Sequence, residues 1–385
     1  MPLEPSASSD LGANLCGGIL RIDLGAIVAN WRLLKGKLAN GANCAAVVKA
    51  DAYGLGMAEV APALHRAGCR VFCVALAEEA LALRALLPDV EIHVFSGATA
   101  ASLPELARHR IIPVLNSLAQ IAAATAFARQ DGAALAADIH VDTGMNRLGL
   151  EERELAALAA DPALLAGLDI RLVMSHLACA DEPGHPLSAR QLAAFRAARA
   201  RLPALGAATA SFANSAGIFL GPDYHFDLAR PGAALYGLKP QNSSPNPMAQ
   251  VVRLQGKILQ VRDVDTPMTV GYGAAHRVTG KARIATVGVG YADGYRQSLT
   301  NRGHAYLGDL RVPVVGRVSM DLIALDVSQA PAASAVPGAL VDLLGPHHDA
   351  DALAAEAQTI GYEILTGLGR RFHRVYVPAK ESQPA

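Results

Sequence analysis

Short apolar runs alternate with alanine- and leucine-rich segments of helical period between residues 45 and 236. This alternation is typical of a parallel sheet whose strands are joined by covering helices. We expect strands at Ala45–Val48, Val71–Ala75, Ile92–Phe95, Ile112–Leu115, Ala137–Val141, Arg171–Met174, Thr209–Ala213 and, with the weakest pattern, Gly232–Leu235. These eight repeats predict a (β/α)8 barrel of the TIM type.

Polar or ionisable residues follow nearly every one of these strands. They are Lys49, Glu78, Ser96, Asn116, Asp142, His176, Asn214 and Ser215. Because the C-terminal ends of barrel strands meet at one mouth, we expect these side chains to gather into a site there.

The pattern changes after about residue 242, where strands follow one another without long helices between them. We expect strands at Val252–Val261, Arg283–Val289, Ala305–Leu307, Val312–Val315, Leu322–Val327 and Leu340–Leu343, then a helix over Asp349–Gly361. The segment Lys239–Pro247, rich in Pro, Asn and Ser, is a candidate linker. The predicted organisation is a flexible tail at 1–18, a barrel at 19–241 and a mostly β domain at 242–385, with residues 381–385 frayed.

Charge and composition narrow the classes of partner. The chain has 34 Lys plus Arg and 34 Asp plus Glu, so no net field attracts nucleic acid or anionic lipid. Hydrophobic residues make up 52% and charged residues 18%, which excludes a disordered chain. We therefore expect a small-molecule partner.

The location of the protein is read from its uncharged segments and its cysteines. The uncharged stretch Ile111–Ala128 contains Pro113, Asn116 and Ser117, which favours a strand running into a capped helix over a membrane span. The first 18 residues lack the apolar core of a secretory signal. The five cysteines have no metal-type spacing and are expected to be reduced thiols. We expect a cytoplasmic protein with no metal and no membrane contact.

The run VVKADAYGLG, residues 47–56, ends an apolar strand on Lys49. A lysine in that place is unfavourable unless it is paired, exposed or used covalently. Desolvation lowers the pKa of an ammonium group and makes the neutral amine available for Schiff-base formation. A lysine that extends to the surface is the alternative reading.

Together with later motifs, this run resembles the alanine racemase family, which consists of barrel-type pyridoxal-phosphate enzymes. The resemblance covers nearly all of the chain after residue 18. Its landmarks are VVKADAYGLG (47–56), HVDTGMNRLG (140–149), ANSAG (213–217), ARPGAALYG (229–237), VGYG (270–273), VGYADGY (289–295), VGRVSMD (315–321) and YEILTGLGRR (362–371).

The resemblance implies that Lys49 holds pyridoxal phosphate and then acts as one acid/base, while Tyr272 of a partner subunit is the other. Racemisation needs two such groups, because the proton must leave one face of a planar adduct and return to the opposite face. The protein is accordingly expected to be a homodimer with composite active sites.

The resemblance also assigns the residues that bind the cofactor. It places His176 and Arg230 near the tyrosine base, and it places Arg230 at the pyridine nitrogen. Since a guanidinium only donates hydrogen bonds, it would leave that nitrogen unprotonated. The phosphate is expected to be bound by Ser215, Gly232, Ala233, Tyr53 and Tyr362.

Arg147 matches the residue that meets the substrate carboxylate, and Tyr291 and Met320 match a narrow substrate entrance formed by the partner subunit. Many family members carry a carbamylated lysine where this chain has His140. Either another acceptor, such as a chloride beside a protonated His140, orients Arg147, or the arginine is less fixed. Asp293 and Asp321 are read as turn residues.

The function implied is the interconversion of L-alanine and D-alanine. A serine, lysine or broad-specificity racemase on the same scaffold is an alternative. A basic amino-acid decarboxylase would need a late cysteine, and no cysteine follows Cys179. A non-catalytic pyridoxal-phosphate carrier would explain Lys49 and the phosphate donors but would not need Tyr272, Tyr291 and Met320.

Overall fold

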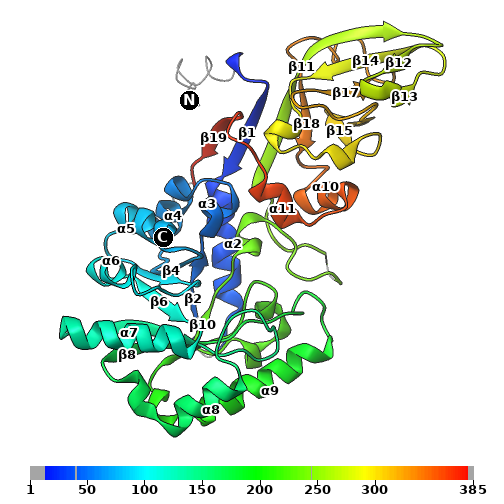
Figure 1. Cartoon of the computed structure of the whole chain (residues 1–385). Helices are drawn as coiled ribbons and strands as arrows, with labels where there is room; N and C mark the ends of the chain where they lie inside the picture. Colours follow the sequence, from blue (N-terminus) through cyan, green and yellow to red (C-terminus); the bar gives the residue numbers. More distant parts are fainter. Residues whose placement is uncertain (1–13, 40, 244, 380–385) are drawn as a thin grey trace, which may run out of the picture. The chain divides into compact units, whose positions relative to one another are not determined.

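The structure is a computed structural model that describes residues 14–39, 41–243 and 245–379. It divides into two compact units: a barrel unit, residues 27–249, and a β unit, the described parts of residues 1–26 and 250–385 (Figure 1). Residues 19–26 were expected in the barrel but belong to the β unit. The described residues of 242–249 were expected in the β domain but belong to the barrel unit. Residues 1–13 of the expected tail lie outside the described residues. The expected fraying of residues 381–385 also lies outside them.

The barrel unit contains a nine-stranded sheet in the order β2-β10-β9-β8-β7-β6-β5-β4-β3, and its paired strands are parallel. The strands are β2 (Asn43–Cys44), β3 (Ala46–Val47), β4 (Val71–Val74), β5 (Glu91–Val94), β6 (Ile112–Leu115), β7 (Leu135–His140), β8 (Leu168–Met174), β9 (Thr209–Ser211) and β10 (Leu228–Ala229).

The sheet closes through one extended segment of which β2 and β3 are two pieces. β2 pairs with β10 at one edge, and β3 pairs with β4 at the other. Between β2 and β3, the N–H of Ala45 donates to the carbonyl of Ala229. Directly after β3, the N–H of Val48 donates to the carbonyl of Cys73. The segment joins both edges of the sheet, and the predicted (β/α)8 barrel is confirmed.

The eighth strand was expected at Gly232–Leu235 and lies instead at Leu228–Ala229, four residues earlier. The expected segment forms a 3-10 turn, Ala233–Tyr236. Two backbone N–H groups there donate to the hydroxyl of Ser215 at 3.0 and 3.2 Å rather than to a neighbouring strand. A strand of two residues is too short to produce an apolar run that sequence reading could detect.

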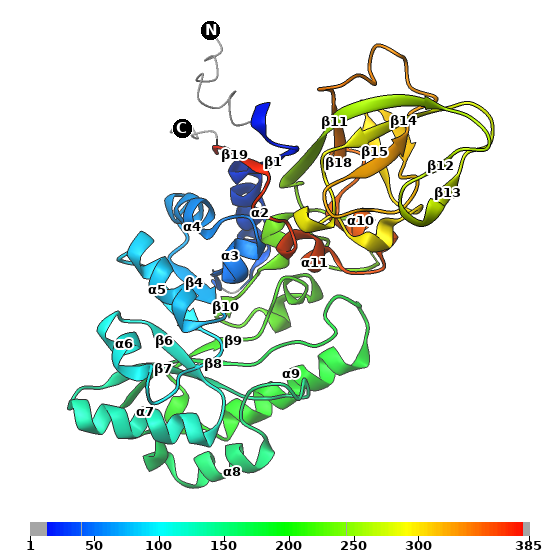
Figure 2. The ribbon, with the colours of Figure 1, turned by 45° about the horizontal axis from the view of Figure 1, so that its top comes forward.

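Helices connect the strands, and α4 to α9 lie on the outside of the sheet (Figure 2). They are α2 (Leu24–Lys37), α3 (Lys49–Tyr53), α4 (Met57–Arg66), α5 (Ala77–Leu86), α6 (Leu103–Arg108), α7 (Leu118–Asp131), α8 (Glu152–Ala160) and α9 (Pro186–Ala200). The uncharged stretch 111–128 forms β6 and α7, with the Ser117 hydroxyl capping α7 as expected. Within the described chain, no helix has both the length and the apolar character needed to cross a bilayer.

The β unit is built on a sheet in the order β16-β15-β18-β11-β1-β19, with β14 and β17 continuing from β11. Its elements are β1 (Gly18–Asp23), β11 (Val252–Val264), β12 (Thr269–Val270), β13 (His276–Arg277), β14 (Ala282–Val287), β15 (His304–Leu307), β16 (Leu310–Pro313), β17 (Ile323–Asp326), β18 (Leu340–Leu344), α10 (Ala350–Ala357), α11 (Gly361–Thr366) and β19 (His373–Val377). Strand β1, from the start of the chain, runs antiparallel to β11 and parallel to β19. This pairing explains why the first strand belongs to the β unit.

Candidate active site

Lys49 is positioned by an unusual backbone turn at the end of the first barrel strand. It begins α3, in which the next four residues, Ala50 to Tyr53, have φ values between 51° and 57°. This is a left-handed turn, which is strained by roughly 1–2 kcal/mol per residue for residues with a Cβ atom. The neighbouring structure must therefore impose it.

Hydrogen bonds from several directions hold this turn. The N–H of Ala50 donates to Oε1 of Glu79 at 2.6 Å, and the N–H of Met57 donates to Oδ1 of Asp51 at 2.7 Å. The second oxygen of Glu79 accepts from the N–H groups of Ala75 and Leu76 at the start of α5. Glu79 thus ties the loop after β4 to the residue that follows Lys49.

The Lys49 side chain is partly buried, and this burial lowers the pKa of its amine. The charge of Arg147 lowers this pKa further, while the charge of Glu79 opposes the shift. A larger fraction of the amine is therefore neutral at physiological pH than for a free lysine. A neutral amine is the form that attacks a carbonyl carbon or accepts a proton.

Arg230, directly after β10, is 3% exposed and is fixed at both ends of its guanidinium. One terminal nitrogen donates to the Ser211 hydroxyl, and the other donates to the Ser175 carbonyl at 2.6 Å. Its Nε is buried and has no hydrogen-bond partner within the described chain. Burial lowers its pKa to about 10, so the group stays charged at neutral pH and has one donor left for an acceptor.

Ser215, Gly232 and Tyr53 form a tightly packed cradle. The hydroxyl of Ser215 accepts hydrogen bonds from the N–H groups of Gly232 and Ala234, so its own proton is left to donate elsewhere. A Cβ atom on Gly232 would lie 2.2 Å from the Tyr53 hydroxyl. The backbone can approach this closely only because residue 232 is glycine. Such a group of small residues and neutral donors suits a bound anion.

His140 lies at the end of β7, and Asn116 determines which of its ring nitrogens carries the proton. The Asn116 amide donates to the carbonyls of Phe95 and Val114, so its Oδ1 must accept from Nδ1 of His140, 2.7 Å away. Burial, and then the charge of Arg230, lower the pKa of His140 to about 4. The imidazole is neutral at physiological pH, which argues against one of the two alternatives for Arg147, a chloride beside a protonated His140.

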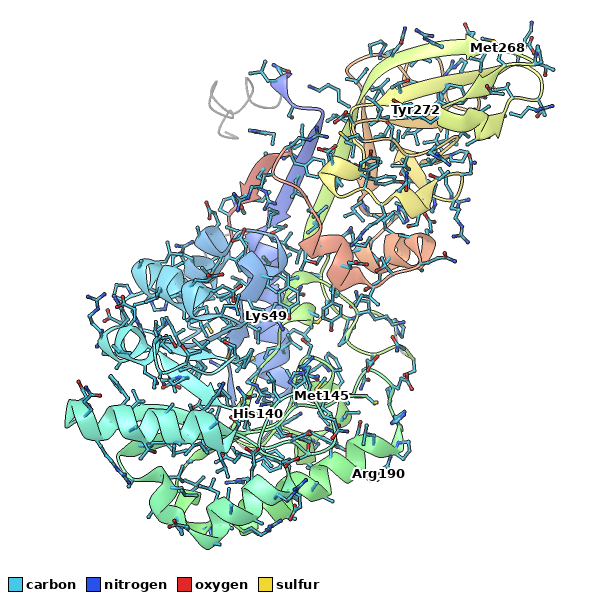
Figure 3. The ribbon with its side chains drawn as sticks, viewed as in Figure 1. Lys49, His140, Met145, Arg190, Met268 and Tyr272 are labelled. Carbon is cyan, nitrogen blue, oxygen red and sulfur yellow. The ribbon has the colours of Figure 1, made fainter. Side chains whose placement is uncertain are left out.

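Arg147 stands on a loop that is ordered by Asp142. The Oδ1 of Asp142 accepts from the N–H groups of Gly144 and Met145, both at 2.9 Å. Arg147 is exposed and makes no ion pair within the described residues. The Arg147 guanidinium is therefore available to an external carboxylate. Its loop also carries Met145, which Figure 3 labels in the barrel unit together with Lys49 and His140.

The β unit presents Tyr272, Tyr291 and Met320 on its surface, with exposures of 71%, 43% and 52%. The loops that carry them are connected: the N–H of Tyr291 donates to the Ser319 carbonyl at 3.0 Å. A Cβ atom on Gly316 would lie 2.7 Å from the carbonyl of residue 270, beside the tyrosine turn. The three side chains thus come from neighbouring loops. Tyr362 lies on α11 and is 47% exposed.

Comparison with known proteins places this arrangement in a family. Models of the alanine racemase N-terminal domain and C-terminal domain match residues 22–240 and 251–376. The chain is 55% identical over 364 residues to an alanine racemase of Rhodospirillum rubrum, covering 94% of this chain and 96% of the relative. It is 48% identical over 375 residues to the alanine racemase of Brucella abortus, covering 94% of each.

A solved structure of alanine racemase from Bartonella henselae with covalently bound pyridoxal phosphate superposes with a TM-score of 0.90. The two are 41% identical, and the match covers 94% of this chain and 99% of the other. The chain belongs to the alanine racemase family.

Membership of the alanine racemase family confirms the predicted family, fold, enzyme class and pyridoxal-phosphate cofactor. The residues present fit that cofactor. Lys49 supplies a desolvated amine, Arg230 a buried donor without a partner, and the Ser215 cradle a place for an anion. Within the alanine racemase barrel, the predicted Lys49, His176, Ser215, Arg230 and the backbone at Gly232 all follow the C-terminal ends of strands.

Sequence reading of this alanine racemase missed several residues around the predicted ones. Glu79, rather than the noted Glu78, contacts the Lys49 turn, and only the rotational phase of α5 distinguishes the two. His93 and Asp138 form a buried ion pair in the barrel, 2.6 Å apart. The available signal was an ionisable residue inside each of two short, largely buried strands.

Proposed function

We propose that the protein racemises alanine with pyridoxal phosphate, using Lys49 of one chain and Tyr272 of a second copy as its two bases. The observation that carries this proposal is the combination, at the barrel strand ends, of a desolvated lysine, a buried arginine with a free donor and an anion cradle.

The cofactor, when bound to Lys49, supplies the conjugated electron sink that stabilises negative charge at the α-carbon. Arg230, held by Ser211 and Ser175, would donate from Nε to the ring nitrogen and keep it unprotonated. Ser215, with the backbone at Gly232 and Ala233, would hold the phosphate. Tyr53 lies against Gly232 and would close the same cradle, to which we also assign Tyr362.

Two groups would then move the α-proton. The Nζ of Lys49 accepts or returns it on one face, and the phenol oxygen of Tyr272 does so on the other. Arg147 would bind the substrate carboxylate, since it is exposed and has no acidic partner within the described chain. His176 is expected beside Tyr272, where it would help to stabilise the phenolate.

A second copy of the chain is part of this proposal. The Tyr272 side chain is 71% exposed in its own β unit, as expected for a group that completes a site on another molecule. Tyr291 and Met320, on neighbouring loops, would form the entrance and restrict it to small side chains such as that of alanine. We also infer that the enzyme acts in the cytoplasm, because Cys44, Cys69, Cys73 and Cys179 are free thiols.

Tyr272→Phe tests the two-base assignment. We expect turnover to fall by roughly 10²–10⁴-fold, because one base is removed while the cofactor remains bound. In D2O, the variant should still exchange the α-hydrogen of one alanine enantiomer without inverting it, since Lys49 is intact. Exchange of both enantiomers at the wild-type rate would refute the assignment.

Mixing two inactive variants tests the composite site. In a heterodimer of Lys49→Ala and Tyr272→Phe subunits, one site contains both native residues. Random mixing should restore about one quarter of the wild-type activity if each site uses residues of two copies. If both residues of a site came from one chain, the mixture would remain inactive.

Substrate range is tested by chiral analysis of each L-amino acid after incubation with the holoenzyme. We expect the D-enantiomer to form efficiently from alanine and poorly from larger amino acids. Comparable conversion of serine or lysine would favour the broad-specificity alternative. The absence of any racemisation, with cofactor bound, would favour a carrier.

A further inference from the structure

A cluster of three side chains in the β unit has no part in the proposed reaction. His304 begins strand β15, His348 closes the turn after β18, and Glu356 lies on helix α10. We call these three residues the His-His-Glu cluster. His304 and His348 are 6% and 2% exposed, and the Glu356 side chain is 21% exposed.

The potential ligand atoms of the cluster converge on one point. Nδ1 of His304 lies 2.5 Å from Oε1 of Glu356, and Nε2 of His348 lies 3.5 Å from Oε2 of Glu356. The two imidazole rings stack with centroids 4.2 Å apart. One ligand atom from each of the three residues lies within 4.8 Å of the others. Two imidazole nitrogens and a carboxylate in this range form a donor set typical of zinc sites.

The hydrogen bonding of the cluster is incomplete. The His348 ring lies near the Leu343 backbone, but neither ring nitrogen has a hydrogen bond of good geometry within the described chain, and Oε2 of Glu356 has none either. The Tyr295 hydroxyl is also buried, with no hydrogen-bond partner among the described residues. A Cβ atom on Gly303 would lie 2.7 Å from this hydroxyl, so the hydroxyl lies beside the residue that precedes His304. Buried polar groups are normally satisfied, and several unsatisfied ones together indicate a missing partner.

We propose that the His-His-Glu cluster of the β unit is a binding site for a divalent transition-metal ion, with Zn²⁺ as the preferred occupant. Three protein ligands leave one coordination position for water, to which the Tyr295 hydroxyl could donate. The ion would connect β15, the turn after β18 and α10, and so would stabilise the β unit.

One neighbouring cation opposes metal binding and gives the proposal a directional test. A terminal nitrogen of Arg311 approaches Nδ1 of His304 at 3.1 Å. A metal ion would have to displace it and would be repelled by its charge. Because Arg311 is exposed, its guanidinium can turn toward solvent. Arg311→Met should therefore bind Zn²⁺ several-fold more tightly than the wild type.

The experiment is a titration of chelator-treated holoenzyme with Zn²⁺, followed by calorimetry and by thermal unfolding. His348→Ala should weaken binding at least tenfold and abolish the rise in Tm caused by Zn²⁺. Glu356→Gln, which keeps the size of the side chain, serves the same purpose if the alanine variant does not fold. The matched control is His347→Ala, because His347 is the adjacent residue but its side chain is 46% exposed and pairs with Asp309.

The control variant separates this site from Zn²⁺ bound at surface histidines or cysteines. We expect His347→Ala to retain wild-type affinity and the wild-type rise in Tm. The proposal is overturned if Zn²⁺ does not bind or raise Tm. It is also overturned if Glu356→Gln and His348→Ala bind Zn²⁺ as tightly as the control does.

Discussion

The left-handed turn after Lys49 makes Ala50→Gly a stabilising substitution, although glycine usually destabilises a helix. Ala50 has φ of 51°, and its side chain is exposed, so removal of the methyl group loses no packing. Glycine adopts this backbone region without the steric conflict that alanine meets. The substitution thus removes strain from the folded state.

The size of the effect follows from two opposing terms. Relief of the left-handed conformation favours glycine by roughly 1–2 kcal/mol, and the greater freedom of glycine in the unfolded chain opposes this by roughly 0.5–1 kcal/mol. The net stabilisation should be ~0.5–1 kcal/mol. For a unit the size of the barrel, this corresponds to a rise in Tm of roughly 1–4 °C.

Ala156→Gly is the matched control. Ala156 is also exposed, but it lies inside the right-handed helix α8, where glycine costs ~1 kcal/mol. Both variants should be unfolded thermally as holoenzymes at one cofactor concentration, with the transition followed by circular dichroism. We expect Tm to rise for Ala50→Gly and to fall for Ala156→Gly. A fall of similar size in both variants would show that the turn after Lys49 is not strained.

Three further substitutions test the barrel. Gly232→Ala places a methyl group against the Tyr53 hydroxyl in the cradle proposed to hold the phosphate and should weaken cofactor retention by ~10-fold, or about 1.4 kcal/mol; unchanged absorbance of bound cofactor after dialysis would contradict this. Glu79→Gln removes a charge that raises the pKa of Lys49, so the neutral amine should form, and the cofactor should be incorporated, at lower pH. An unchanged pH midpoint of incorporation would show that Glu79 does not have this role. Burial disfavours protonated His93, but Asp138 and then Glu91 outweigh burial and raise its pKa to about 10. Protonated His93 contributes its full stabilisation below about pH 6.5, which is near the pKa of histidine in the unfolded chain. This stabilisation is lost by about 1.4 kcal/mol per pH unit as the pH rises toward 10. Tm of the wild type should fall over this range more steeply than Tm of Asp138→Asn, and parallel curves would refute the link.

The sequence predicted those features that depend on local pattern. Apolar runs located most barrel strands, because a buried parallel strand is apolar on both faces. Ser117 identified the start of α7, since its side chain satisfies a helix N–H group. Lys49 stood out because a lysine at the end of an apolar strand needs a physical reason.

Features that depend on tertiary structure were not predictable from the sequence. Alanine has no intrinsic preference for the left-handed turn at Ala50, which is imposed by hydrogen bonds to distant residues, such as that donated by the Ala50 N–H to Glu79. Strand β1 was not among the expected strands, and its partners on β11 and β19 lie more than 200 residues away in the sequence. The His-His-Glu cluster likewise joins three separate elements, and no local spacing indicates it.

The electrostatics of the barrel site explain why an anionic cofactor and substrate belong there. The pKa values of Lys49, His140 and His176 are all lowered, first by burial and next by the charge of Arg147 or Arg230. The three lowered pKa values therefore indicate the same excess of positive charge in the barrel site. A phosphate in the Ser215 cradle and a carboxylate near Arg147 would supply the opposing charge and raise these pKa values. A neutral histidine at position 140, unlike a carbamylated lysine, adds no negative charge, so the substrate carboxylate itself would be the main counter-charge for Arg147.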